Sequence, residues 1–247
     1  MFKVLFAFLF CSFSFCNYVE KDFNYLVFKN MNGFTPEMLR LHFKLYSGYV
    51  KNTNDLLHAL KGMDDTTMAY HALKRRLGFE WDGMRLHELY FENLGGDGKI
   101  DKEGGLYKAL LSEWGSYDKW MQNFKAMGMM RGVGWVILYE DPISHKLCNV
   151  WIEDHEIGHL SGATPLLVMD VWEHAYLTEY GLNRTGYIKA FFENIDWSAV
   201  DTRRVPKELE KKEEPSSLQG KSERRWQSDK QKSNPKQTPP KPVPSSV

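Results

Sequence analysis

The chain has 247 residues, enough for one or two domains, and its 32 basic and 32 acidic side chains give a formal net charge of zero. This balance excludes a strongly basic surface for nucleic acid, so no nucleic-acid partner is expected. Aromatic residues make up 14% of the chain and include eight tryptophans, which favours a well-packed globular body over disorder.

The first 16 residues, MFKVLFAFLFCSFSFC, have the composition of a secretory signal peptide. Lys3 precedes the apolar residues 4–10, and small serines follow. Because this apolar run is shorter than the ~20 residues that span a bilayer, we expect no stable membrane span and a secreted or periplasmic protein. The alternatives are an ordinary buried segment or a lipoprotein anchored at Cys16, which the bulky Phe15 disfavours.

Cysteine placement limits the ways in which the mature protein can be stabilised. Cys11 and Cys16 lie within the predicted leader, which leaves Cys148 alone in the remaining chain. A single cysteine cannot form an intramolecular disulfide, so stability in an oxidising compartment would depend on the core and on any bound metal.

A first helix is predicted to begin after Thr35, an N-cap residue followed by Pro36 at the first helical position and by the acidic Glu37. Residues at steps of three and four then share one helical face. They are Leu39, His42, Phe43, Tyr46, Tyr49 and Val50. His42 therefore points inward, and by itself it is better interpreted as a core histidine with one hydrogen-bond partner.

A second helical segment is predicted from about Thr66 to Leu94, with Gly78 and Gly83 as candidate kink points. The glycine-rich residues 95–99 follow. They have neither the Lys-Ser/Thr ending of a phosphate-binding loop nor the alternating acids of a calcium-binding loop, so a plain connection is expected.

Three histidines in this region are candidates for a buried site. His87 lies among large apolar residues in the run MRLHELYF. His71 lacks aromatic residues directly after it, and His58 falls near the tip of the expected hairpin.

The second half of the chain predicts helices and a small sheet. Residues 106–130 form two helices interrupted near Ser116. Three short runs rich in β-branched, aromatic and other apolar residues follow at 134–139, 146–152 and 166–169. The predicted fold class is α+β, with an N-terminal antiparallel helical hairpin and a C-terminal domain of helices around a small, about three-stranded antiparallel sheet.

The change in composition along the chain predicts its domain organisation. The segments are a signal peptide at 1–16, a helical hairpin domain at 34–112, a C-terminal α+β domain at 113–205 and a tail at 206–247. The tail is rich in Lys, Glu, Ser, Gln and Pro and has one aromatic residue, so it is predicted to be disordered.

The run HEIGH at residues 155–159 matches the zinc-peptidase motif, in which two histidines bind zinc and a glutamate activates water. That motif must lie within a helix. A predicted strand precedes it here, and Gly158 interrupts it, which disfavours a peptidase that uses His155, Glu156 and His159.

The run DVWEHAY at residues 170–176 places Asp170 and His174 four residues apart, directly after the third predicted strand. If the chain turns there, the two side chains project toward one point, with Trp172 and Tyr176 lining it. An oxygen ligand beside a nitrogen ligand suits iron or manganese, and zinc nearly as well. By spacing alone, a surface hydrogen-bonded pair is more common.

The motif DVWEHAY, with Tyr180, Arg184 and Tyr187 after it and then AFFENIDW at residues 190–197, resembles the iron/manganese superoxide dismutase family. The run GVGW at 132–135 is similar to the start of that family's first strand. The resemblance covers roughly residues 34–204.

This resemblance implies one iron or manganese ion per subunit, held by three histidines and one aspartate. On this chain the ligands would be His42, His87, Asp170 and His174. His155 falls where many members carry a glutamine of the active site, and this departure removes the usual sequence clue to iron or manganese.

The resemblance also implies roles for residues around the ion. His155 and Tyr49 would be catalytic, orienting solvent and relaying protons. Six further side chains would lie around the ligands, namely Tyr46, Tyr90, Trp135, Trp172, Glu173 and Tyr187. Tyr46 stands where relatives often carry histidine, and Tyr49 comes one residue early.

The function implied is disproportionation of superoxide to oxygen and hydrogen peroxide by a homodimer, in which Glu173 reaches His174 of the partner subunit and Tyr187 packs nearby. Two alternatives remain open. One is a non-catalytic metal-binding or adhesive relative, favoured by the leader, Tyr46 and the long tail, and the other is the zinc peptidase.

Overall fold

The structure, a computed structural model, describes residues 17–204. The predicted signal peptide (1–16) and tail (206–247) lie outside the described residues. None of the helices in residues 17–204 is both long and apolar enough to cross a membrane.

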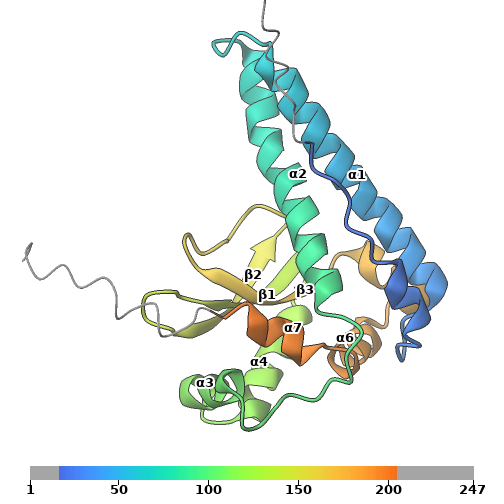
Figure 1. Cartoon of the computed structure of the whole chain (residues 1–247), viewed down its shortest axis with the longest axis vertical. Coiled ribbons are helices and arrows are strands. Elements are labelled where there is room, and N and C mark those ends of the chain that lie inside the picture. The colour runs from blue at the N-terminus through green and yellow to red at the C-terminus, as the bar shows by residue number, and fades with distance from the viewer. Residues whose placement is uncertain (1–16, 205–247) are drawn as a thin grey trace, which may run out of the picture. The chain divides into compact units, whose positions relative to one another are not determined.

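Two long antiparallel helices, α1 (Pro36–Lys61) and α2 (Met68–Glu92), form the predicted hairpin, and the loop that joins them projects away from the sheet (Figure 1). The predicted start of α1 is confirmed, because the Met38 N–H donates to Thr35 Oγ1 at 3.2 Å. Helix α2 continues unbroken through both candidate kink points. At Gly83 the missing side chain makes room for the ring of Tyr49, which lies 2.6 Å from where a Cβ would stand.

The segment before the hairpin packs along it and includes the short 3-10 helix η1 (Asn24–Phe28). The backbone of Tyr18 is paired with the side chain of Asn54, whose amide accepts from the Tyr18 N–H at 2.8 Å and donates to its carbonyl at 2.9 Å. Leu26 of η1 is buried in the same core as the hairpin.

The second half of the described chain confirms the predicted α+β class. Its elements are α3 (Gly105–Trp114), α4 (Tyr117–Gly128), β1 (Gly134–Glu140), β2 (Leu147–Glu153), β3 (Thr164–Asp170), the 3-10 helix η2 (Glu173–Ala175), α5 (Leu177–Tyr180), α6 (Arg184–Glu193) and α7 (Trp197–Thr202). The three strands form an antiparallel sheet in the order β2-β1-β3, and β1 is buried along its whole length. Trp135 of β1 is paired with Asp170 of β3, which brings an indole beside the last residue of that strand.

The hairpin and the sheet meet where α2 ends against β3. The buried Asn93, directly after α2, donates to the Val168 carbonyl at 2.6 Å. The Arg203 guanidinium donates to Asn93 Oδ1 at 2.6 Å and to the carbonyls of Leu166 and Leu89 at 2.7 and 3.0 Å. These bonds fix the end of α2 relative to β3, while the domain boundary near residue 112 stays a prediction.

Candidate metal centre

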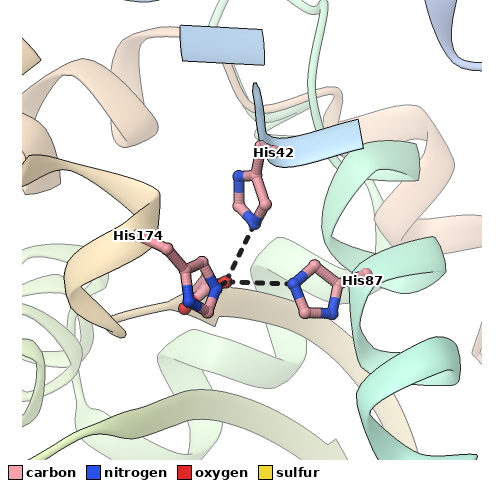
Figure 2. A group of neighbouring side chains, drawn as sticks. His42, His87 and His174 are labelled. Atoms are coloured by element: carbon pink, nitrogen blue, oxygen red, sulfur yellow. Dashed lines mark hydrogen bonds and ion pairs between the residues drawn. The ribbon is translucent and has the colours of Figure 1, made fainter. Parts of the chain in front are cut away.

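Four side chains predicted as ligands come together in the interior, from α1, α2, the end of β3 and η2 (Figure 2). Their ligand atoms all lie within 4.8 Å of one another. His42 Nε2 and His174 Nε2 lie 3.1 and 3.0 Å from Asp170 Oδ2, and His87 Nε2 lies 3.7 Å from the same oxygen. Residues separated by more than 120 positions therefore converge on one carboxylate.

The orientation of His87 identifies what kind of group fits between these side chains. Its Nδ1–H donates to the Gly83 carbonyl at 2.6 Å, so its Nε2 carries a lone pair. This nitrogen is buried and finds no hydrogen-bond partner among residues 17–204. It faces Asp170 Oδ2, an acceptor that already has His42 Nε2 and His174 Nε2 as hydrogen-bond partners, and a cation among these atoms would give His87 Nε2 a partner as well.

The orientation and the charge of the Asp170 carboxylate are also fixed by its contacts. Its Oδ1 accepts from the Trp172 N–H at 2.8 Å, which leaves Oδ2 directed at the three imidazoles. Burial alone raises the pKa of this carboxyl, but the charge and hydrogen bond of His174 and those of His42 outweigh burial and lower the pKa. The carboxylate is therefore anionic at neutral pH.

Burial also affects the protonation of two of the imidazoles, those of His42 and His87. It lowers the pKa of His42, against the opposing effect of Asp170, and lowers the pKa of His87 further, where the charge of His42 adds to burial. Neutral imidazole is the form that binds metals. Three imidazole nitrogens and one carboxylate oxygen gathered in the interior suit a first-row ion such as iron or manganese.

A second group, Tyr49, His155 and Trp135, lies directly beside the ligands. The Trp135 Nε1–H donates to His155 Nδ1 at 2.9 Å. Because indole is only a donor, the proton of neutral His155 lies on Nε2, where it donates to Tyr49 Oη at 2.7 Å. Burial lowers the pKa of His155 to about 4, so this neutral form is present at pH 7. Both ring nitrogens of His155 are thus held by protein side chains.

The position of Tyr49 is explained by helix geometry. Seven residues separate it from His42, which is close to two turns of α1, so both point the same way. The Tyr49 ring stacks on His87 with centroids 5.0 Å apart and an angle of 29°. The shortened spacing therefore still brings the hydroxyl to the site.

The rings of two tryptophans, Trp135 and Trp172, lie against the ligand histidines. The Trp135 ring is fully buried and meets His87 edge-on at 4.9 Å. The Trp172 ring is stacked against both His155 and His174, at 4.8 and 5.7 Å. These rings exclude bulk water from two sides of the ligand group.

Two of the predicted tyrosines, Tyr187 and Tyr90, contact the ligand residues Asp170 and His42. The Tyr187 hydroxyl donates to the backbone carbonyl of Asp170 at 2.7 Å and lies 3.1 Å from the Tyr90 hydroxyl. The Tyr90 ring lies 5.1 Å from that of His42. Both tyrosines are fully buried, and burial raises the pKa of each, so they remain protonated.

The structure does not bring Tyr46 or Glu173 into contact with the ligand atoms. The Tyr46 hydroxyl donates to Glu88 Oε1 and accepts from the Lys21 N–H, both at 3.0 Å. A phenol is longer than an imidazole, so it reaches past the ligands to this ion-pair network. Glu173 is exposed on η2 beside His174.

Residues 155–159 form a turn and not a helix, as the sequence predicted. His155 and His159 point to different partners, since His159 Nδ1 contacts the Tyr139 hydroxyl at 2.6 Å and its Nε2 contacts the His155 carbonyl at 2.8 Å. The geometry of a zinc peptidase is not formed. His58 and His71 are exposed, away from the ligand group.

Sequence reasoning did not identify two residues that shape the site. The Phe79 ring lies 4.5 Å from that of His155, and Gly83 supplies both the carbonyl that orients His87 and the space for Tyr49. Phe79, Gly83 and His87 lie at steps of four on α2, so the available signal was their common helical face.

The fold and the four ligands define a buried mononuclear metal centre of three histidines and one aspartate. Residues 102–203 match the sequence model of the C-terminal domain of iron/manganese superoxide dismutases. The chain is 36% identical over 180 residues to the iron superoxide dismutase of Cupriavidus metallidurans, which covers 70% of this chain and 89% of that relative.

Other relatives include enzymes named for either metal. The iron superoxide dismutase of Aquifex pyrophilus is 35% identical over 184 residues, covering 71% of this chain and 86% of the relative. A manganese superoxide dismutase of Haloferax volcanii is 37% identical over 129 residues, covering 52% and 64%. The chain belongs to the iron/manganese superoxide dismutase family.

The low pKa of His155 predicts how the stability of the metal-free protein depends on pH. Between its folded pKa of about 4 and the ordinary 6.5, unfolded His155 takes up a proton that folded His155 does not, so stability falls as the pH falls. His155→Gln should reduce this slope by about 1.4 kcal/mol per pH unit between pH 6 and 4.5 in urea titrations. His71→Gln, on an exposed residue, is the control, and an unchanged slope in His155→Gln would contradict the buried neutral state.

Proposed function

We propose that this protein is a superoxide dismutase, which converts two superoxide anions and two protons into dioxygen and hydrogen peroxide. The observation that carries the proposal is the convergence of His42, His87, Asp170 and His174, with Tyr49 and His155 beside them. One ion fits this set of ligands, the one such group found within residues 17–204. When bound, iron or manganese supplies one-electron chemistry by alternating between its trivalent and divalent states.

The proton required for peroxide formation would be handled by Tyr49 and His155. Since His155 donates to Tyr49 Oη, the single proton of the tyrosine hydroxyl is directed elsewhere and is available to reduced substrate. Burial raises the pKa of Tyr49, so the hydroxyl keeps that proton at neutral pH. Trp135 donates to the other ring nitrogen of His155, so the proton of His155 stays on Nε2, directed at Tyr49.

The surrounding rings would restrict what reaches the ligand group. Trp135, Trp172 and Phe79 pack around His155, and the Tyr49 ring lies across His87. A diatomic anion is small enough for such an aromatic-walled site, whereas larger reductants are excluded.

The proposal is tested by loading purified protein with iron and, separately, with manganese, and measuring superoxide decay together with metal content. We expect activity with at least one metal. Asp170→Ala should lose the ion and decay superoxide no faster than buffer, whereas Asp65→Ala on the exposed hairpin loop should retain both. Turnover by Asp170→Ala would contradict the ligand assignment. If the wild type is inactive with iron and also with manganese, the dismutase proposal fails and the alternative of a non-catalytic relative remains.

Gly83→Ala tests the role of the Tyr49 side chain in turnover without removing a metal ligand. A Cβ at this position would lie 2.6 Å from Tyr49 Cδ1, so the ring must move away from His155, while the backbone carbonyl that orients His87 remains. Steady-state kinetics should show kcat lowered by about tenfold to a hundredfold at unchanged metal content. Gly48→Ala, which meets no heavy atom within 4 Å, is the matched control. Equal activity of the two variants would argue against a role of Tyr49 in turnover.

We further propose a homodimer in which Glu173 contacts His174 of the partner subunit. Glu173 is exposed, the His174 side chain is 25% exposed, and within residues 17–204 no hydrogen bond is made by His174 Nδ1. A carboxylate from a second copy would satisfy this nitrogen. Analytical ultracentrifugation should give a dimer that Glu173→Ala weakens and Glu179→Ala does not. A wild-type monomer at micromolar concentration would refute the proposal.

Export to a secreted or periplasmic location is proposed from the composition of residues 1–16. The backbone of Tyr18 is paired with the side chain of Asn54, and removal of residues 1–16 would leave both of these bonds in place. N-terminal sequencing of protein recovered from the medium or periplasm should find residues 1–16 removed. Intact Met1 on cytoplasmic protein would refute export.

A further inference from the structure

We propose that His159 is a positioning residue for His155, an inference that rests on the proposed dismutase function. The second histidine of the HEIGH run has no part in the ligand group. Its Nε2 lies 2.8 Å from the His155 carbonyl, and because a carbonyl only accepts, the proton of His159 is on Nε2. Its Nδ1 lies 2.6 Å from the Tyr139 hydroxyl, and its Nε2 also lies 3.8 Å from Asp82 Oδ2.

The bonds to the ring and the main chain of His155 start from side chains of the central strand, β1. Tyr139 and Trp135 are four residues apart on β1, so their side chains project from the same face. Trp135 donates to the His155 ring, while Tyr139 acts through His159 on the His155 backbone. His155 is thus fixed at both its ring and its main chain by one strand.

The backbone around His155 needs this support. It follows Asp154, whose φ of +52° is unfavourable for a residue with a side chain, and the turn continues to Gly158 at +108°. An isolated bridge from Glu153 to Ile157 pairs this turn with the end of β2. At Asp154 the backbone N–H donates to the Val133 carbonyl at 3.3 Å, and the carbonyl accepts from the Trp172 Nε1–H at 3.1 Å. The bond from His159 closes the turn from the other side, as its ring reaches back four residues to the His155 carbonyl.

The consequence concerns the direction of the bond from His155 to Tyr49. That bond is 2.7 Å long and depends on the ring staying between Trp135 and Tyr49. If the His155 main chain shifts, the ring cannot keep both partners, and the tyrosine proton loses its fixed direction. His159 would therefore affect turnover without contacting substrate or metal.

The experiment compares variants of the metal-loaded full chain by two readouts, kcat for superoxide and azide affinity from visible absorption of the trivalent metal. His159→Phe keeps a ring and removes both bonds together with the contact to Asp82 Oδ2, whereas Tyr139→Phe removes only the bond between Tyr139 and His159. We expect kcat to fall and the azide dissociation constant to change, each by about threefold to tenfold, at unchanged metal content. His159→Gln, whose amide donates and accepts, should recover part of both. His71→Phe is the control, since it loses a comparable bond to the Asp65 carbonyl at the exposed hairpin end.

Two further comparisons make the inference refutable. In a chain that already carries His155→Ala, His159→Phe should produce no additional effect on either readout, because the ring to be positioned is gone. If His159→Phe lowers the melting temperature but leaves kcat and azide affinity at wild-type values, His159 is only structural and the proposal fails. Azide binding is read without turnover, so an inactive wild type would sink the dismutase proposal while still testing the role of His159.

Discussion

The structure depends on the interaction of one buried carboxylate oxygen with three imidazole nitrogens that arrive from separate elements. His87 cannot donate to Asp170 because its proton is committed to the Gly83 carbonyl, so two acceptors face each other at 3.7 Å. Leaving His87 Nε2 buried without a partner is costly, and a cation between it and Asp170 Oδ2 removes that cost. A bound ion would therefore also join the helical hairpin to the sheet.

The rest of the fold keeps these atoms in place. Hydrogen bonds from Asn93 and Arg203 tie the end of α2 to β3, which sets His87 against Asp170. The central strand adds a second constraint, because Trp135 is paired in register with Asp170 and also orients His155. The ligand Asp170 and the neighbouring His155 are thus both held by the central strand, and such a rigid support is what electrostatic preorganisation requires.

Much of this arrangement was predictable from local sequence. The cap at Thr35, the helix interruption near Ser116 and the turn in place of a peptidase helix at residues 155–159 each follow from short-range chemistry. The assignment of His42 was different, since helix periodicity alone favoured an ordinary core histidine. Only the resemblance of the whole pattern singled it out as a ligand, because three of its partners lie far away in the sequence.

The remaining features depend on contacts that no local pattern encodes. Tyr46 shares the inward face of α1 with His42, yet its hydroxyl reaches Glu88, because side-chain length and not only helical phase decides what a residue meets. Gly83 read as a candidate kink but is a close-approach point for Tyr49, a role visible only when both helices are packed. Export, the dimer and the choice between iron and manganese stay predictions.

The central claim is that four side chains from the hairpin and the sheet bind a single ion. Anomalous diffraction at the metal edge of iron- or manganese-loaded crystals tests it most directly. The account predicts one peak per chain, about 2.0–2.2 Å from His42 Nε2, His87 Nε2, His174 Nε2 and Asp170 Oδ2. A peak between His155 and His159, or loaded crystals with no peak at the four ligands, would contradict it.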